Sequence, residues 1–307
     1  MFRKIAGFFS TVAIVLILVG VLYNYRDPIF KMYHKLFHKT SDPIELSNDY
    51  YRDYDFSYVK NTTDTTPDNY QGLLDLFYTI LNHGYSNYKF YCGDKYDSCL
   101  DDVKKLAKDQ DILSNVNNFI HPYNSFESVE IAYNQDGLVN VEFTKNYNDE
   151  DIELINEEVN KVYNTLYNPS DTQFNQILKF HDYIVNKAKY DTPRAENGDT
   201  TYKSNIAYGP LFENYAICSG YTDLMELFLE KLNIKSFKVA TNDHVWNAVL
   251  IEDVWYNLDL TWDDPVTNTG ADFLDHDYFM ISSIRIKEMD LTQHDFDYDI
   301  YKELKNS

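Results

Sequence analysis

The residue with the clearest chemical potential is Cys218, which stands at the start of a predicted helix. Apolar residues after it recur every three to four positions, at Tyr221, Leu224, Phe228 and Leu232. A thiol at a helix start faces the positive end of the helix dipole and unpaired backbone N–H groups, which favour the nucleophilic thiolate. The same N–H groups can stabilise the oxyanion that forms when a thiolate attacks a carbonyl. Taken alone, a cysteine in this place is more often an ordinary buried residue.

Two further residues with catalytic side chains lie on a predicted β-hairpin. Residues 243–251 and 254–262 alternate like strands, and Glu252-Asp253 between them suits a two-residue turn. That turn places His244 and Asp259 on one face of the sheet as diagonal neighbours, with Cβ atoms roughly 7 Å apart. A loop one residue longer would put the two side chains on opposite faces.

Together these three residue types form the set needed for acyl transfer by a thiol. A carboxylate that holds one imidazole nitrogen fixes the tautomer and leaves the other nitrogen to take the thiol proton. We therefore assign Cys218 as nucleophile, His244 as general base and Asp259 as the orienting group. A strand histidine alone is usually structural and an aspartate alone can cap a turn, so the hypothesis depends on the combination.

The same residues carry a family resemblance. Residues 216–221 (AICSGY), 244–247 (HVWN) and 259–265 (DLTWDDP) resemble the three motifs of the bacterial transglutaminase-like superfamily. Residues 180–185 (FHDYIV) resemble the helix that such domains carry ahead of the cysteine. The likeness covers about residues 170–285.

The resemblance implies a papain-like α+β fold, in which an antiparallel sheet packs against the nucleophile helix. It also implies the triad of Cys218, His244 and Asp259, with no cofactor and no metal. The chain departs from the family at residues 214–216 (NYA), where relatives usually have glycine near the thiol. This departure affects the loop and leaves the triad intact.

The function that the resemblance implies is attack on amide bonds through a thioester. Water as the second substrate would make the chain a peptidase or amidase, whereas a lysine amine would make it a cross-linking transglutaminase. The triad serves both reactions, and we favour hydrolysis. The expected partners are protein or peptide substrates, such as cell-wall peptide. The alternative is a catalytically inactive transglutaminase-like module that binds or scaffolds at the cell surface.

The amino-terminal segment has the character of a membrane anchor. Residues 5–23 are apolar and uncharged, long enough to cross a bilayer, and they follow Arg3 and Lys4 as in an export signal. Bulky residues stand where a signal peptidase needs small ones, which favours an uncleaved anchor over a cleaved peptide. We expect a single-pass protein of the cell membrane whose globular part is extracytoplasmic, although the flanking positive charges do not decide the orientation.

The chain is predicted to divide into four parts: a transmembrane signal anchor (5–23), a juxtamembrane linker (24–66), a small α+β module of unknown role (67–168) and a transglutaminase-like domain (169–307). Within the last two parts, apolar spacing predicts helices over 70–82, 151–166 and 172–189, and a hairpin of 129–133 with 138–143. His83 and His121 are expected to be structural or surface residues. The predicted fold class is α+β throughout.

The charge and cysteine content of the chain bear on its binding partners and on its disulfide bonding. Lys and Arg number 27 against 49 Asp and Glu, a net charge of −22, which disfavours nucleic-acid binding. Cys92 and Cys99 either form a disulfide or remain reduced, and a bridge would leave Cys218 as the free thiol. Residues 295–299 alternate aspartates as in a calcium loop but lack the glycine required at its sixth position, so no calcium site is expected there.

Overall fold

The computed structural model describes residues 41–108, 111–265 and 273–307. The predicted anchor (5–23) and the first part of the predicted linker (24–40) lie outside the described residues. In the part of the chain that is described, no helix has both the length and the apolarity needed to cross a membrane. Residues Asp42–Ser307 form one compact α+β unit.

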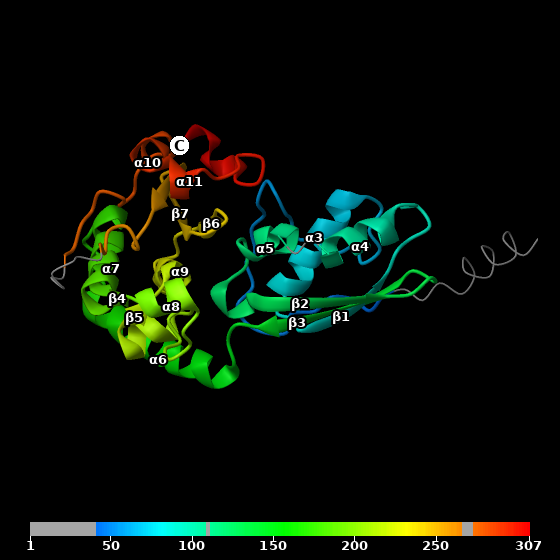
Figure 1. Ribbon diagram of the computed structural model, residues 1–307, viewed down its shortest axis with the longest axis horizontal. Coiled ribbons are helices and arrows are strands. Elements are labelled where there is room, and N and C mark those ends of the chain that lie inside the picture. Colours follow the sequence, from blue (N-terminus) through cyan, green and yellow to red (C-terminus); the bar gives the residue numbers. More distant parts are fainter. Residues whose placement is uncertain (1–40, 109–110, 266–272) are drawn as a thin grey trace, which may run out of the picture. The chain divides into compact units, whose positions relative to one another are not determined.

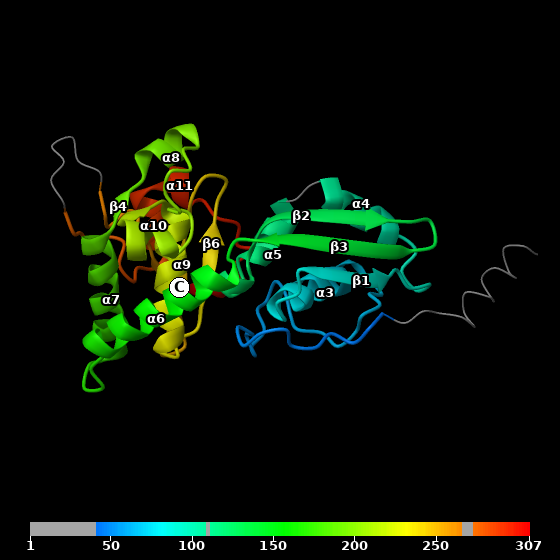
Figure 2. The ribbon, with the colours of Figure 1, turned by 90° about the horizontal axis from the view of Figure 1, so that it is seen from below.

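A three-stranded antiparallel sheet organises the first half of this unit. Its strands are β1 (Asn87–Tyr91), β2 (Phe126–Tyr133) and β3 (Leu138–Lys145), with β3 in the middle (Figure 2). The β2–β3 pair is the hairpin predicted from the alternating sequence. Three helices lie on one face of this sheet (Figure 1): α3 (Tyr70–Asn82), α4 (Cys99–Lys108) and α5 (Asp111–Asn117). A short 3₁₀ turn, η1 (Pro122–Asn124), precedes β2.

Helix α3 has the bounds that its apolar spacing predicts. The side chain of Asn69 accepts a hydrogen bond from the backbone N–H of Gly72 and so caps the first turn. Leu73, Phe77 and Ile80 point into the core and are fully buried. Burial of this apolar face holds the helix against the sheet.

The second half is built around a central helix, α9 (Cys218–Lys231). It packs against α7 (Gln173–Lys187) and against the sheet of β6 (Ser236–Ala240), β7 (Val245–Ile251) and β8 (Val254–Leu258), in which β7 is central. Helix α6 (Asp149–Leu166) covers α9 as well. This arrangement, an antiparallel sheet against a central helix, agrees with the α+β class expected from the sequence.

Shorter elements complete the second half of the unit. They are β4 (Lys189–Tyr190) with its parallel partner β5 (Tyr215–Ala216), α8 (Thr192–Asn197), the π-helical turn η2 (Gly209–Glu213), α10 (Ser283–Met289), α11 (Leu291–His294) and the 3₁₀ turn η3 (Lys302–Asn306).

The β7–β8 hairpin has the predicted register. Ile251 pairs with Val254 and Asn247 pairs with Leu258. Glu252 and Asp253 form the turn with φ angles of 49° and 63°, as a two-residue type I′ turn requires. Because side chains alternate along a strand, this register decides which residues share the face that carries the site.

Apolar residues from both sides of residue 168 pack in one buried cluster. One buried cluster joins Phe56 and Phe119 to Phe237 of β6, with ring centroids 4.9 Å (Phe56–Phe119) and 5.2 Å (Phe119–Phe237) apart. Phe56 belongs to the segment predicted as a linker, and Val59 of that segment is fully buried too. These apolar residues have no helical or strand period, so the sequence alone shows only an irregular segment.

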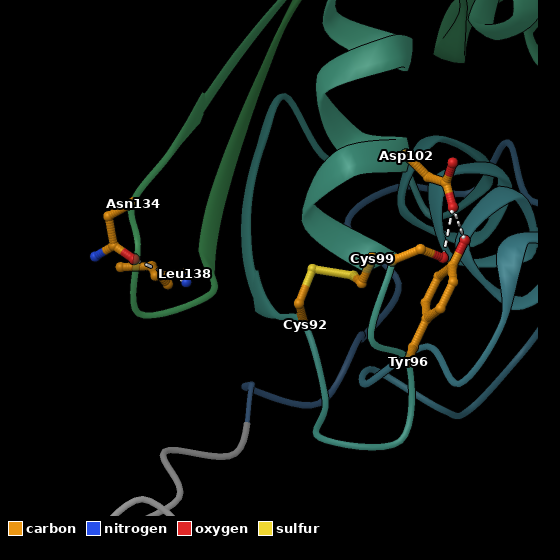
Figure 3. Close-up of a disulfide and its surroundings, with 7 residues drawn as sticks. Cys92, Tyr96, Cys99, Asp102, Asn134 and Leu138 are labelled. Atoms are coloured by element: carbon orange, nitrogen blue, oxygen red, sulfur yellow. Dashed lines mark hydrogen bonds between the residues drawn. A yellow bond between two sulfur atoms is a disulfide. The ribbon is translucent and has the colours of Figure 1, made fainter. Parts of the chain in front are cut away.

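Cys92 and Cys99 form a disulfide that ties the end of β1 to the start of α4 (Figure 3). Beside it, the backbone N–H of Cys92 donates to the carbonyl of Gly137 in the β2–β3 turn. Tyr96, within the loop that the bridge closes, donates to the Asp102 carboxylate over 2.6 Å. The choice that the sequence left open is thus resolved in favour of the bridge, and Cys218 is the free thiol.

Removal of this bridge is expected to destabilise the unit. Closing a loop between cysteines seven residues apart reduces the entropy of the unfolded chain, for a stabilisation of roughly 2.5 kcal/mol. We expect Cys92→Ser/Cys99→Ser to lower the free energy of urea unfolding by that amount, and Cys218→Ser to leave it nearly unchanged. Equal stability of the double variant and the oxidised chain would contradict a bridge in solution.

Candidate active site

Cys218 is the first residue of α9, and a neighbouring loop fixes its position. Ile217 before it is extended, and its backbone N–H donates to the carbonyl of Ser204 over 2.9 Å. Gly220 lets this loop approach, since a Cβ there would lie 2.2 Å from the Ser204 carbonyl oxygen. The Ser219 hydroxyl donates to the carbonyl of Asn205 over 2.8 Å. The half-buried thiol is thereby held at the end of the helix where backbone N–H groups lack intrahelical partners.

His244 and Asp259 meet where the β7–β8 hairpin opens. His244 directly precedes β7 and Asp259 directly follows β8. The imidazole Nε2 lies 2.6 Å from the carboxylate Oδ2, and the residues are 6% and 1% exposed. Cys218 lies close enough to the same imidazole to contribute to the raised pKa of His244. The structure therefore brings His244 and Asp259 into contact and places the Cys218 thiol near the imidazole.

The second oxygen of Asp259 shapes the chain that follows. Oδ1 accepts hydrogen bonds from the backbone N–H groups of Thr261, over 3.0 Å, and Trp262, over 3.3 Å. These bonds turn the backbone out of the sheet. The strand predicted to run to residue 262 was too long, and β8 ends at Leu258. A carboxylate held by two backbone donors has a fixed orientation toward His244.

A second histidine, which no sequence pattern predicts, binds the same carboxylate. His294 of α11 is fully buried, and its Nε2 lies 2.9 Å from Asp259 Oδ2. Its Nδ1 lies 3.1 Å from the carbonyl oxygen of Asp290. Asp259 thus bridges two imidazoles. No local pattern around residues 291–296 signals this role, because the contact depends on how a short terminal helix packs.

His244 and Asp259 each stabilise the charged form of the other. Burial opposes the charged form of His244, but the charge and hydrogen bond of Asp259, together with Cys218, raise its pKa to about 10. Burial likewise opposes the carboxylate of Asp259, yet His244 and His294 hold the pKa of that carboxyl well below its usual range. His244 is consequently protonated and Asp259 ionised at neutral pH.

The raised pKa of His244 predicts a loss of stability at high pH. A group whose pKa rises on folding stabilises the fold fully below its unfolded value, here 6.5, and loses that effect as the pH passes about 10. We expect the free energy of unfolding to fall on the order of 3 kcal/mol between pH 6.5 and 9.5. The fall should disappear in His244→Gln. Parallel urea-unfolding profiles for both proteins would contradict the assignment.

Two tryptophans near the triad have different roles. Trp246 is 1% exposed, its ring stacks on His244 with centroids 5.6 Å apart, and its indole N–H donates to Asn257 over 2.9 Å. It is therefore a core residue that backs the imidazole. Trp262 is 36% exposed and its indole N–H donates to Gln293 over 3.0 Å, so it lies at the surface beside the site.

The loop before the thiol contains a residue with a left-handed backbone. Asn214 has a φ of 62°, a left-handed conformation that asparagine tolerates better than most residues with a side chain. It thus supplies a backbone shape that glycine would otherwise provide. Residue Ala216 then pairs with Tyr190, whose phenol lies close enough to interact with the charge of Cys218.

The two histidines expected to be structural have partners within the fold. His121 is buried, with its Nε2 2.8 Å from Glu230 and its Nδ1 accepting the backbone N–H of Tyr123. His83 ends helix α3, and its ring packs edge-on against Tyr51. Neither residue belongs to the triad.

Comparison with known proteins gives distant likenesses in fold. No family model matches the chain, and no curated protein matches it. A solved structure of a TGase (transglutaminase) aligns with a TM-score of 0.32 and 14% identity over 45% of this chain and 44% of that one. A candidate cysteine protease from Cytophaga hutchinsonii aligns with a TM-score of 0.29 and 13% identity over 50% of this chain and 69% of that one.

This chain therefore spans less than half the length of the transglutaminase that it resembles. The unit itself is an α+β domain of helices and small antiparallel sheets. At these identities and TM-scores the two likenesses assign neither a family nor an activity.

Proposed function

We propose that this chain is a transglutaminase-like cysteine enzyme that acts on amide bonds through Cys218, His244 and Asp259. The observation that carries the proposal is the 2.6 Å contact between His244 Nε2 and Asp259 Oδ2, beside a free thiol at the start of a buried helix. With Nε2 held by the carboxylate, Nδ1 is the nitrogen left to exchange a proton with the sulfur.

In the proposed reaction, the thiolate of Cys218 attacks the carbonyl carbon of an amide. A cationic imidazole beside a thiol favours the thiolate, and the high pKa of His244 (about 10) keeps the imidazole cationic at neutral pH. The imidazolium then gives its proton to the departing amine nitrogen as the C–N bond breaks, and a thioester remains. A second nucleophile, which loses its proton to the neutral imidazole, resolves the thioester.

Two groups near the sulfur are suited to stabilising the oxyanion. The backbone N–H groups of Cys218 and Ser219 begin α9 and have no intrahelical acceptor. The half-buried phenol of Tyr190, which interacts with the charge of Cys218, is a second donor on the neighbouring strand. We assign Tyr190 to this role as part of the proposal.

Water or an amine can act as the second nucleophile, and we favour water. The protein would then be a peptidase or amidase acting on protein or peptide, with cell-wall peptide as a fitting substrate class. We further propose that residues 5–23 anchor the chain and that the globular unit is extracytoplasmic. The disulfide of Cys92 and Cys99 supports this location, since such bridges persist in oxidising compartments.

The direct test is turnover on a peptide library in the presence of a fluorescent primary amine. Cleaved peptides without amine incorporation are expected, and Cys218→Ala should abolish them while Cys92→Ser/Cys99→Ser retains them. Amine incorporation without cleavage would overturn the hydrolytic assignment. An absence of both products, together with a thiol that reacts no faster than in the unfolded chain, would leave the inactive binding module as the explanation.

A further inference from the structure

A second cluster of histidine and carboxylate side chains lies outside the triad. It comprises His181 and Asp182 on α7 and His276, which precedes α10. The Oδ1 atom of Asp182 lies 3.0 Å from His181 Nδ1 and 2.8 Å from His276 Nε2. One donor atom from each residue lies within 4.8 Å of the others.

Both ring nitrogens of His181 face a carboxylate oxygen. His181 is fully buried, and its other nitrogen, Nε2, lies 3.1 Å from Oδ2 of the buried Asp263. Nδ1 is therefore the ring nitrogen of His181 that faces the carboxylate oxygen of Asp182, at 3.0 Å.

This pattern is the one found around metal-bound histidines. A ligating imidazole usually donates its remaining N–H to a carboxylate, which fixes the ring and the tautomer, and Asp263 is in position to do this for His181. Asp263 is in turn fixed, because its Oδ1 accepts the backbone N–H of Tyr278 over 2.9 Å. His181 is therefore held with its Nδ1 toward Asp182.

We propose that His181, Asp182 and His276 bind a divalent zinc ion. Two imidazole nitrogens and one carboxylate oxygen suit zinc, whereas calcium and magnesium prefer oxygen ligands alone. Tetrahedral ligands at about 2.1 Å from zinc lie roughly 3.4 Å apart, so contacts of 2.8 Å and 3.0 Å need an expansion of about half an ångström. His276 is 43% exposed, which gives the ion access and leaves room for water as a fourth ligand.

The proposed zinc site is linked to the triad by backbone. Asp263 supports His181, and its backbone N–H donates to the carbonyl of Asp259 over 3.3 Å. Zinc would link α7, through His181 and Asp182, to the segment that carries His276. It would thereby stabilise the turn that follows Asp259. This role is independent of whether the triad is catalytic, so each proposal can fail alone.

The test is zinc binding by the full chain in a Cys218→Ser background, which removes a thiol that could itself take the metal. Competition with a chromophoric chelator should show one zinc ion bound per chain, and cobalt at the same site should give visible absorption. His276→Ala and Asp182→Asn should each weaken zinc binding at least 100-fold. Asp263→Asn, which alters only the supporting carboxylate, should weaken it about 10- to 100-fold.

Three controls test whether zinc binds at this site and not elsewhere on the chain. Zinc affinity should stay within twofold in His34→Ala/His38→Ala, which removes a pair of histidines from the amino-terminal segment. It should also stay within twofold in His244→Ala. Calcium at the same concentration should not compete. Circular dichroism of the metal-free variants establishes that they are folded, and the exposed position of His276 makes its replacement structurally mild. Zinc binding that is undetectable, that survives both His276→Ala and Asp182→Asn, or that is lost with the amino-terminal pair would overturn the proposal.

Discussion

Replacement of Asp259 by asparagine is expected to lower amide turnover about 10⁴-fold. Asp259 Oδ2 lies 2.6 Å from His244 Nε2 and 2.9 Å from His294 Nε2. An amide in its place loses the negative charge that keeps His244 protonated. It also offers a single acceptor oxygen, which must serve the two imidazoles and the backbone donors of the turn. The rate is measured on whichever peptide the unmodified chain cleaves.

Asp243→Asn is the matched control for this variant. It makes the same change of charge one residue from His244, at an exposed side chain outside the triad. Turnover by this variant should stay within a few-fold of the unmodified chain. Turnover by Asp259→Asn within tenfold of the unmodified chain would contradict the orienting role of Asp259.

Replacement of Arg52 by methionine is expected to cost about 3–5 kcal/mol in the free energy of unfolding. The Arg52 guanidinium is buried and donates to Glu226 of α9 over 3.0 Å, and to the carbonyls of Phe119 and Ser236 over 3.1 Å each. Glu226 is itself buried. Loss of the cation leaves that carboxylate in the interior without its counter-charge.

Urea unfolding measures this cost, and two further variants interpret it. Lys89→Met removes an exposed cation on β1 and should change stability by less than about 0.5 kcal/mol. Arg52→Met/Glu226→Gln should be more stable than Arg52→Met alone, because no charge then remains buried without a partner. A cost below about 1 kcal/mol for Arg52→Met would contradict a stabilising role for the buried contact between Arg52 and Glu226.

The part of the site that could be predicted is the part set by local sequence. Glu252 and Asp253 determine a two-residue turn, the turn determines the register of β7 and β8, and the register brings His244 and Asp259 together. The apolar spacing after Cys218 predicts that this residue lies at the start of a helix. These inferences need only neighbouring residues, because hairpin and helix geometry are local.

The rest of the fold and of the site depends on tertiary contacts that no local sequence pattern indicates. Strand β6 was missed because Lys238 interrupts its apolar residues, and only the structure shows Lys238 buried against the carboxylate of Asp223. His294 reaches Asp259 across 35 residues of sequence. The burial of Arg52 likewise depends on Glu226, which is 174 residues away along the chain.

The most direct measurement of the central claim is the rate at which iodoacetamide alkylates Cys218 at pH 6, where an ordinary thiol with a pKa of ~8.5 is almost entirely protonated. Mass spectrometry reports modification of Cys218 separately from the disulfide-bonded Cys92 and Cys99. An imidazolium at His244 paired with a thiolate predicts alkylation about 100-fold faster in the native chain than in His244→Ala or in the unfolded protein. Equal rates in all three would contradict an activated thiol.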